Sequence, residues 1–195
     1  MNSIIEKEKK LNSVLEKLKN LNLKNPELDK NIEELKKKKN QLEIEKKDLE
    51  EKYNICNHLL YLDSKSYTQT DKNLIPTGKI ILTQNSEMDF SYKKKIGKIK
   101  LDDNYVLEVK NHLVRPAAEL FNPVSNLKLK LWTDQPGIQV YNASSLNLAP
   151  KGLNGLSYGN FSGICLEDQK FPDSVNKLDF PSIISSPEKP YFHKT

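Results

Sequence analysis

The sequence predicts an all-β antiparallel domain that follows an N-terminal α-helical segment. Over residues 1–52, apolar side chains recur about every 3.5 positions among Lys and Glu residues, which is typical of an amphipathic helix. From Tyr53 onward, short alternations of apolar and polar residues are separated by Gly, Pro, Asn and Asp, which is typical of strands joined by turns. The 195 residues are 36% hydrophobic, which suits one modest globular domain with a polar extension. We therefore expect a helical segment at residues 1–52 and a β domain at residues 53–195.

The helical segment follows a heptad pattern that predicts a coiled-coil seam. It contains almost no glycine, and its Lys and Glu residues favour helix. Lys39 and Lys46 fall at seam positions, where they weaken the seam and can set its register or partner number. Such a seam predicts self-association. The two sets of seam positions are Ile4, Leu11, Leu18, Asn25, Ile32, Lys39 and Lys46, and Val14, Leu21, Leu28, Leu35, Leu42 and Leu49.

One interruption divides this segment, at Asn25-Pro26. Asn25 is a good N-cap residue, and a proline is tolerated in the first turn of a helix. A second helix is therefore expected to begin here. The heptad register continues past the proline, which slightly favours a kinked rod, but a chain that folds back as a helical hairpin stays open.

The β segment has one strand pattern that is clearer than the rest. Leu127, Leu129 and Leu131 alternate with polar or amphipathic neighbours, which predicts a half-buried strand. Further strands are expected at residues 79–83, 105–109 and 137–141, with turns at 76–78, 135–137 and 151–152. Strands at this spacing predict an antiparallel sandwich.

Composition excludes several classes of protein. The N-terminus has only Ile4 and Ile5 before charges begin, and no apolar run approaches membrane-spanning length, so we expect a cytoplasmic protein with no membrane partner. Cys56 and Cys165 lie far apart, with no Cys-x-x-Cys pair, which argues against a metal site or a disulfide framework. The chain also has no glycine-rich phosphate loop.

The lysine run at residues 36–39 raises the possibility of nucleic-acid binding, because clustered lysines neutralise phosphates. However, residues 1–52 hold 14 Lys against 12 Asp and Glu, a net charge of only +2. Such alternating charge describes a solvated helix face, and no aromatic residues interleave with the lysines as a stacking platform would need. We expect no nucleic-acid partner.

Glu167 is the candidate catalytic residue. Ile164 and Leu166 are apolar and two apart, so in a strand they share one face, while Cys165 and Glu167 share the other. A carboxylate on a rigid strand can act as a general base, although spacing alone also fits a solvent-exposed glutamate. If Glu167 is desolvated, its pKa should rise toward the working pH.

Four blocks in the β segment match, in the same order, the motifs of one known family. Those motifs are Tyr-Thr-x-x-Asp with Leu-Ile-Pro-Thr-Gly, Asp-His-Asn-Phe-x-Leu, Thr-x-Gln-Pro-Gly-x-Gln-x-Tyr, and Glu-x-Gln with Pro-Asp-Ala-x-Asn. The matching residues here are Tyr67-Thr68 with Asp71 and Leu74-Ile75-Pro76-Thr77-Gly78; Asp102 with Asn104-Tyr105-Val106-Leu107; Thr133 with Gln135-Pro136-Gly137-Ile138-Gln139-Val140-Tyr141; and Gly163-Ile164-Cys165-Leu166-Glu167 with Gln169 and Pro172-Asp173-Ser174-Val175-Asn176. Residues 54–195 thus resemble the later part of the galactose mutarotase, or aldose 1-epimerase, family.

This resemblance implies a fold, a reaction and three site residues. The fold is the later part of a large β-supersandwich. The reaction interconverts the α and β anomers of a hexose such as galactose or glucose, and it needs no metal or redox cofactor. By motif, Glu167 matches the family's base, Asp102 its sugar-binding aspartate and Gln139 its sugar-binding glutamine. The sequence has Asp103 where the family usually has histidine, which places a second acid beside Asp102.

The match is incomplete at the family's general acid. That residue is a histidine in an Asn-His-Ser-Tyr-Phe-Asn-Leu-like stretch, which should precede His58, where this sequence has its helical segment. His58 resembles a different family position and is expected to be a satisfied structural histidine. His112 lies in no matching block, and His193 resembles a histidine near the family's C-terminus.

These differences leave the activity open. Missing strands would expose sheet edges, which favours association. The chain could be a truncated gene product, a domain completed by a second copy, or an epimerase with impaired activity. The alternative function is that of a non-catalytic, oligomerising coiled-coil protein with a vestigial sugar-binding domain.

Overall fold

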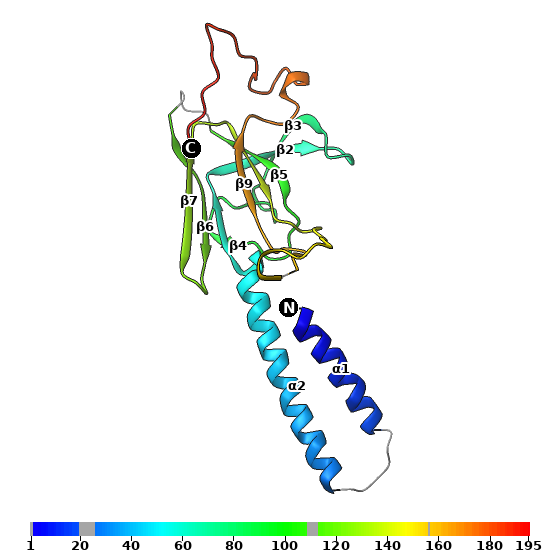
Figure 1. Cartoon of the computed structure of the whole chain (residues 1–195). Coiled ribbons are helices and arrows are strands. Elements are labelled where there is room, and N and C mark those ends of the chain that lie inside the picture. Colours follow the sequence, from blue (N-terminus) through cyan, green and yellow to red (C-terminus); the bar gives the residue numbers. More distant parts are fainter. Residues whose placement is uncertain (1, 20–25, 109–112, 156) are drawn as a thin grey trace. The chain divides into compact units, whose positions relative to one another are not determined.

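The computed structural model describes residues 2–19, 26–108, 113–155 and 157–195 (Figure 1). The chain divides into two compact units. One comprises Met1–Tyr53 with Asn147–Gly159, and the other comprises Asn54–Leu146 with Asn160–Thr195. Within the described residues, none of the helices is long and apolar enough to cross a membrane.

The N-terminal segment forms two helices, α1 (Asn2–Lys19) and α2 (Pro26–Tyr53), the second beginning at the proline as expected. Glu8 of α1 and Lys46 of α2 form an ion pair at 3.5 Å, so the helices fold back on each other. Of the two arrangements that the sequence leaves open, the structure has the hairpin, and the slightly favoured kinked rod is wrong. A coiled coil is not confirmed, and residues 20–25 of the proposed seam lie outside the described residues.

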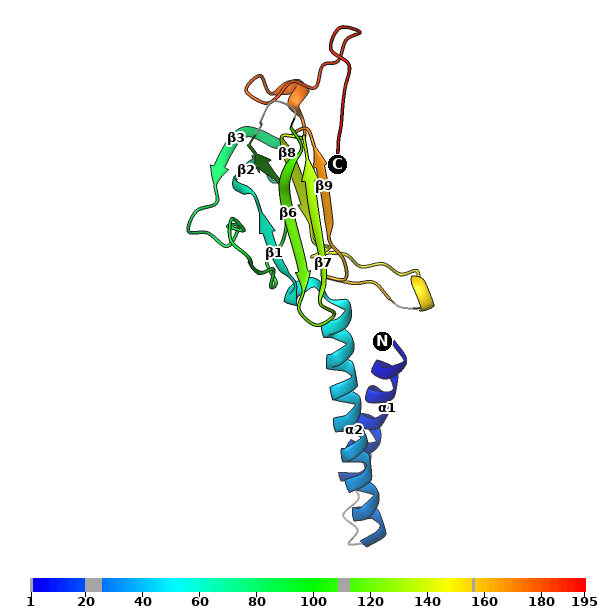
Figure 2. The ribbon, with the colours of Figure 1, turned by 90° about the vertical axis from the view of Figure 1, so that its left-hand side faces the viewer.

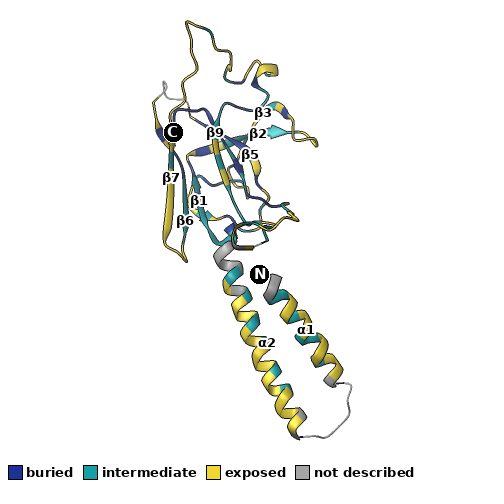
Figure 3. Cartoon of the chain, viewed as in Figure 1, coloured by how far each residue is buried: buried dark blue, intermediate teal, exposed yellow. Residues whose placement is uncertain are grey.

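The inner face of α1 differs from the predicted seam. Leu11 and Leu15 are half-buried, whereas Val14, which the heptad placed in the seam, is 41% exposed. On α2, Ile32, Leu35 and Leu42 keep their expected inward placement but are also only half-buried (Figure 3). Two helices alone cannot enclose a seam on all sides, so no described side chain of the hairpin is fully buried.

The described strands are antiparallel and form two sheets (Figures 1 and 2). The five-stranded sheet has the order β3-β2-β5-β8-β9, and the four-stranded sheet has the order β4-β1-β6-β7. The bounds are β1 (Leu59–Leu62), β2 (Ser64–Thr70), β3 (Pro76–Leu82), β4 (Lys94–Lys95), β5 (Asp102–Leu107), β6 (Arg115–Asn122), β7 (Leu127–Thr133), β8 (Gly137–Tyr141) and β9 (Cys165–Gln169). This is the antiparallel sandwich that the strand spacing predicts.

The core lies between the two sheets. Leu60 and Leu62 of β1 pack in one cluster with Tyr105 of β5 and with Ile138 and Val140 of β8. All five are almost fully buried. In β8 the alternation thus directs Ile138 and Val140 inward, and it leaves Gln139 and Tyr141 on the outer face of the five-stranded sheet. The core therefore fixes the orientation of the polar residues on that face.

Two strand predictions need correction. Pro76 was expected in a turn but begins β3, which stands at the end of its sheet, where a residue without an N–H group is tolerated at the first position. The predicted burial of β7 is wrong for Leu127 and Leu129, which are 71% and 49% exposed. β7 is an edge strand of the four-stranded sheet. The alternation places these leucines on one face of the strand, and at this edge that face is left uncovered. Residue 109 of the expected strand 105–109 lies outside the described residues.

Candidate functional site

Three neighbouring strands of the five-stranded sheet carry the predicted site residues on one face. Gln139 on β8 is the register partner of Asn104 on β5 and of Glu167 on β9. Side chains of direct register partners point to the same side of a sheet, so these three residues form a row across it. Asp102 lies two residues before Asn104 and shares its face. The strand order therefore brings together Asp102, Gln139 and Glu167, which are far apart in the sequence.

This face lines a cavity of about 590 Å³. Such a volume is within the usual range for small-molecule sites, which runs from about 300 to 1,000 Å³. All three predicted residues line it, and so do Tyr141 and Gln169. Most of the lining side chains are polar, which suits a ligand that carries several hydroxyl groups. The further lining residues are Thr68, Thr70, Leu74, Pro76, Asn104, Ser145 and Pro172.

Two of the predicted residues are hydrogen-bonded to each other. The Gln139 Nε2 group donates to Asp102 Oδ1 at 2.8 Å. Asp102 is exposed and Gln139 is half-buried, so the pair is accessible from the cavity. An ionised carboxylate accepts several hydrogen bonds, which leaves Asp102 able to accept others beside the one from Gln139.

Glu167 is exposed on the same face. Its carboxylate is therefore open to solvent. Its neighbour two residues earlier, Cys165, is also exposed, and burial together with the Glu167 carboxylate raises the pKa of the Cys165 thiol. A raised pKa favours the protonated thiol over the thiolate.

Asp103 lies on the opposite face from Asp102, because consecutive side chains of a strand alternate. Burial raises the pKa of Asp103, although the Asp102 N–H donates to its carboxylate at 3.2 Å and acts in the other direction. The Asp103 side chain is thus turned toward the same side as buried Tyr105, whose own pKa is raised by burial and by Asp103. It does not line the cavity with Asp102.

The described histidines do not line the cavity either. His58 is half-buried just before β1, and burial lowers its pKa. A backbone hydrogen bond with Asn54 acts on this pKa in the opposite direction, and the assignment of His58 as a structural histidine stays a prediction. His112 lies outside the described residues.

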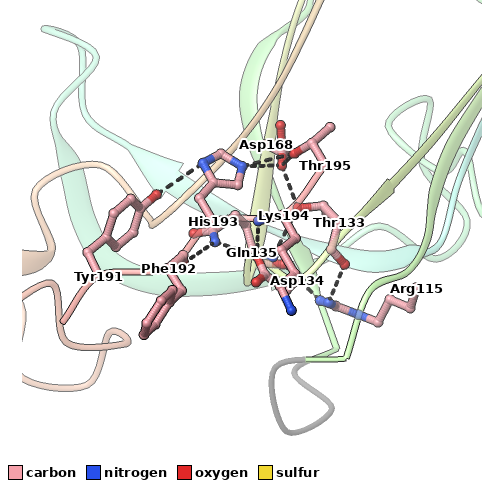
Figure 4. A network of polar contacts seen from close by, with 10 residues as sticks. All are labelled: Arg115, Thr133, Asp134, Gln135, Asp168, Tyr191, Phe192, His193, Lys194 and Thr195. Carbon is pink, nitrogen blue, oxygen red and sulfur yellow. Dashed lines mark hydrogen bonds and ion pairs between the residues drawn. The ribbon is translucent and has the colours of Figure 1, made fainter. Parts of the chain in front are cut away.

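His193 belongs to a polar network on the other face of β9 (Figure 4). Its Nε2 atom lies 2.6 Å from Asp168 Oδ2, and its Nδ1 atom lies 3.1 Å from the Tyr191 hydroxyl. Asp168 also accepts hydrogen bonds from the hydroxyls of Thr133 and Thr195. Burial raises the pKa of Asp168, but the hydrogen bonds from these donors lower it by more, so the pKa lies below its ordinary value. The network ties the C-terminal residues to β9 and to the end of β7.

The same network continues into the connection between β7 and β8. The Asp134 N–H donates to the Lys194 carbonyl at 3.2 Å, and the Lys194 N–H donates to Asp134 Oδ1 at 3.2 Å. The Arg115 guanidinium donates to the carbonyls of Thr133 and Gln135 at 3.0 and 2.9 Å. This connection leads directly into Gly137 and Gln139, so the network supports the strand that carries the central member of the row.

Several cavity residues were not singled out from the sequence. Asn104 and Gln169 both belong to the quoted motif blocks and lie two residues from Asp102 and Glu167, respectively. Because residues two apart in a strand share one face, the sequence already placed both on the same face as a predicted site residue. Thr70 and Ser145 gave no such signal, because their position follows from the tertiary arrangement of β2 and of the residues after β8.

Comparisons with known proteins agree with this arrangement. The family model described as aldose 1-epimerase matches residues 48–195. The chain is 32% identical over 151 residues to a galactose mutarotase of Homo sapiens, an alignment covering 73% of this chain and 43% of that protein. It is 32% identical over 127 residues to an aldose 1-epimerase of Haemophilus influenzae, covering 61% and 37%, respectively. The chain thus spans less than half the length of these relatives.

A solved structure supports the fold. The crystal structure of an aldose epimerase homologue from C. elegans superposes with a TM-score of 0.61 at 21% identity, covering 72% of this chain and 44% of that one. The similarity is between folds, and it is consistent with the two antiparallel sheets described above.

Proposed function

Because the chain belongs to the aldose 1-epimerase family, we propose that residues 53–195 bind a hexose in the cavity of the five-stranded sheet and interconvert its anomers. The observation that carries this proposal is the placement of Asp102, Gln139 and Glu167 around one cavity. Three residues matched by separate motifs lie on three adjacent strands and face the same space. Galactose and glucose are the proposed substrates.

Glu167 is the proposed general base. Anomer interconversion begins when a base takes the proton from the hydroxyl on the anomeric carbon. The bond between that carbon and the ring oxygen then breaks, the ring oxygen gains a proton, and the open-chain aldehyde forms. After rotation of the aldehyde group, the hydroxyl that was the ring oxygen attacks the carbonyl carbon and gives its proton back to the donor that supplied it. The carbonyl oxygen takes the proton from Glu167, which gives the other anomer. A bound sugar would displace water from the exposed Glu167 carboxylate, which would strengthen it as a base.

Asp102 and Gln139 are the proposed sugar contacts. The hydrogen bond from Gln139 fixes the Asp102 carboxylate before a ligand arrives. Fixing both side chains in advance reduces the entropy that binding costs, because fewer rotamers remain to be restricted. The remaining acceptor capacity of Asp102 would receive sugar hydroxyls. Tyr141, on the same face, offers an aromatic surface for the apolar side of a pyranose ring.

The ring oxygen also needs a proton donor. Among the described residues, neither His58 nor His193 lines the cavity, and we propose that water reaching the exposed side near Glu167 supplies this proton. Water is a weaker acid than a positioned side chain, so turnover by this chain would be slower than a site with both an acid and a base allows. Polarimetry of the intact chain and of its Glu167→Gln variant tests the proposal.

The helical segment, residues 1–52, is the proposed site of self-association. Its inward residues remain half-buried in the hairpin, and Val14 and Ile44 are 41% and 56% exposed. Covering these apolar side chains with a second copy of the chain would lower the free energy, because it removes apolar surface from water. A hexose and a second copy of the chain are therefore the two partners that we propose.

A further inference from the structure

Asn104 is the most buried side chain that faces the cavity from the row described above. It is 3% exposed, yet it lines the cavity and is the register partner of Gln139. Glu167, at the other end of the row, is exposed. The row thus has a buried end and an open end, separated by two interstrand spacings, which together amount to about 10 Å.

The Asn104 carboxamide is incompletely hydrogen-bonded. Its Nδ2 group makes one long contact, at 3.5 Å, to the Thr68 hydroxyl. Its Oδ1 atom is buried and has no partner in the part of the chain that the structure describes. A buried acceptor without a donor is unfavourable, so native proteins normally supply a partner from side chains, water or ligand.

A second buried asparagine shows that the fold can satisfy such a group. Asn142 is 0% exposed, its Oδ1 accepts from the Leu101 N–H at 3.1 Å, and its Nδ2 donates to the Ile99 carbonyl at 2.7 Å. Asn142 does not line the cavity. Asn142 is hydrogen-bonded within the protein, as expected of a structural residue. Asn104 has an unpaired oxygen, as expected of a residue that binds a ligand.

Gly137 leaves the space that the Asn104 amide occupies. A Cβ atom at residue 137 would lie 2.5 Å from Asn104 Oδ1 and 2.9 Å from the ring of Phe171. Gly137 precedes Gln139 by two residues and shares its face. The absence of a side chain at residue 137 therefore leaves room for the unpaired Asn104 oxygen.

We infer that Asn104 is a specificity-determining residue, whose carboxamide hydrogen-bonds to one hydroxyl of the bound hexose. This inference rests on the proposed function of the cavity, and it adds a contact at the buried end of the row. Because Glu167 acts at the anomeric hydroxyl, the hydroxyl that meets Asn104 is one remote from the anomeric carbon. A sugar with no correctly placed hydroxyl there leaves the amide unpaired, and such an unpaired group discriminates between ligands.

The direct test observes the side-chain amides of the intact protein by ¹H–¹⁵N NMR during titration with galactose and with glucose. We expect the Asn104 carboxamide signals to shift with the same dissociation constant as those of Gln139, while the Asn142 carboxamide, as the matched control, does not move. Shifts at Gln139 with none at Asn104 would overturn this inference alone. No shifts at either residue, for either sugar, would overturn the proposed function as well.

Affinity measurements with monodeoxy hexoses identify the hydroxyl. The wild-type chain should bind one deoxy analogue about five- to tenfold more weakly than the parent sugar. The Asn104→Ala variant should bind the parent sugar more weakly than the wild type does, by the same factor. It should then bind the parent sugar and that analogue equally well. If Asn104→Ala retains the full discrimination of the wild type against every analogue, Asn104 does not set specificity. The NMR titration needs only the wild-type protein, so it decides the question even if the variant fails to fold.

Discussion

Gln139 and Glu167 are direct register partners on β8 and β9, so the proposed sugar contact and the proposed base stand side by side on one face of the sheet. Cross-strand partners of this kind are fixed by the backbone pairing of two strands, and a one-residue slip of either strand would turn its own side chain to the other face. Ile138 and Val140 are fully buried, and this burial holds the register. The hydrophobic core thus determines the geometry of the polar site.

Replacing Asp102 with Ala should weaken hexose binding. The substitution removes an acceptor for sugar hydroxyls and releases the Gln139 amide, which Asp102 holds at 2.8 Å. Hydrogen bonds to charged groups contribute about 1.5 to 3 kcal/mol, which corresponds to a loss of affinity of about 10- to 150-fold. Calorimetric titration with galactose measures the effect. The matched control is Asp103→Asn, on the opposite face, which should leave the affinity unchanged. Equal affinities for the wild type and Asp102→Ala would remove Asp102 from the site.

Asp103→Asn should instead stabilise the fold, in a pH-dependent way. Burial raises the folded-state pKa of Asp103 above its unfolded value of about 3.9. The stability that this group contributes is therefore full below pH 3.9 and is lost as the pH rises through the folded-state pKa. Asparagine keeps an acceptor without the charge, so the variant should melt about 2 °C or more above the wild type at pH 7. The difference should vanish near pH 3. A lower melting temperature for the variant at pH 7 would show that the carboxylate is favourably placed.

The C-terminal network should loosen when Asp168 loses its charge. Its hydrogen-bond donors hold the pKa of Asp168 below its ordinary value, so its stabilising contribution is present above pH 3.9 and is lost as the pH falls through the lower folded-state pKa. In Asp168→Asn at neutral pH, the Lys194 amide should exchange with deuterium about tenfold faster or more, because a charge-assisted hydrogen bond contributes about 1.5 to 3 kcal/mol. The exposed Asp179→Asn variant is the control. Unchanged exchange at Lys194 would mean that His193 and Thr195 do not depend on Asp168.

The sequence predicted much of the site but less of its surroundings. The motif blocks singled out Asp102, Gln139 and Glu167, which line one cavity and whose roles stay a prediction, and the predicted strand 137–141 coincides with β8. Asn104 was within the quoted block, yet nothing in a sequence distinguishes a buried amide with partners, as in Asn142, from one without. Partners of this kind are supplied by distant segments, so they appear only once the chain is folded.

The alternation patterns did not predict which faces of the strands and helices are buried. They placed Leu127 and Leu129 on one face of β7 but could not show that this face is uncovered, because burial depends on the opposing sheet. Val14 fitted the heptad and is exposed, whereas Leu15, which the heptad left out of the seam, is half-buried. Asp168 showed no pattern at all. Its role comes from residues 191–195 returning to β9, which local sequence does not encode.

The helical segment should drive reversible self-association of the intact chain. Sedimentation equilibrium is expected to show a concentration-dependent dimer, because Val14 and Ile44 expose apolar surface on the hairpin. The Ile44→Lys variant should weaken this dimer by about tenfold or more, since burying one such side chain contributes about 1.5 to 3 kcal/mol. Asn31→Lys adds the same charge at an exposed position of α2 and should have little effect. A wild-type chain that stays monomeric at high concentration would contradict the proposal.

The most direct test of the proposed function is the rate at which freshly dissolved α-galactose reaches its anomeric equilibrium, followed by polarimetry. We predict that the intact chain accelerates this approach. The Glu167→Gln substitution should lower the catalysed rate about 100- to 10,000-fold, because a general base typically contributes that factor. Glu87→Gln, which changes an exposed glutamate away from the cavity, should keep the wild-type rate. Equal rates for wild type and Glu167→Gln, both matching the uncatalysed reaction, would contradict the assignment of this cavity as an epimerase site.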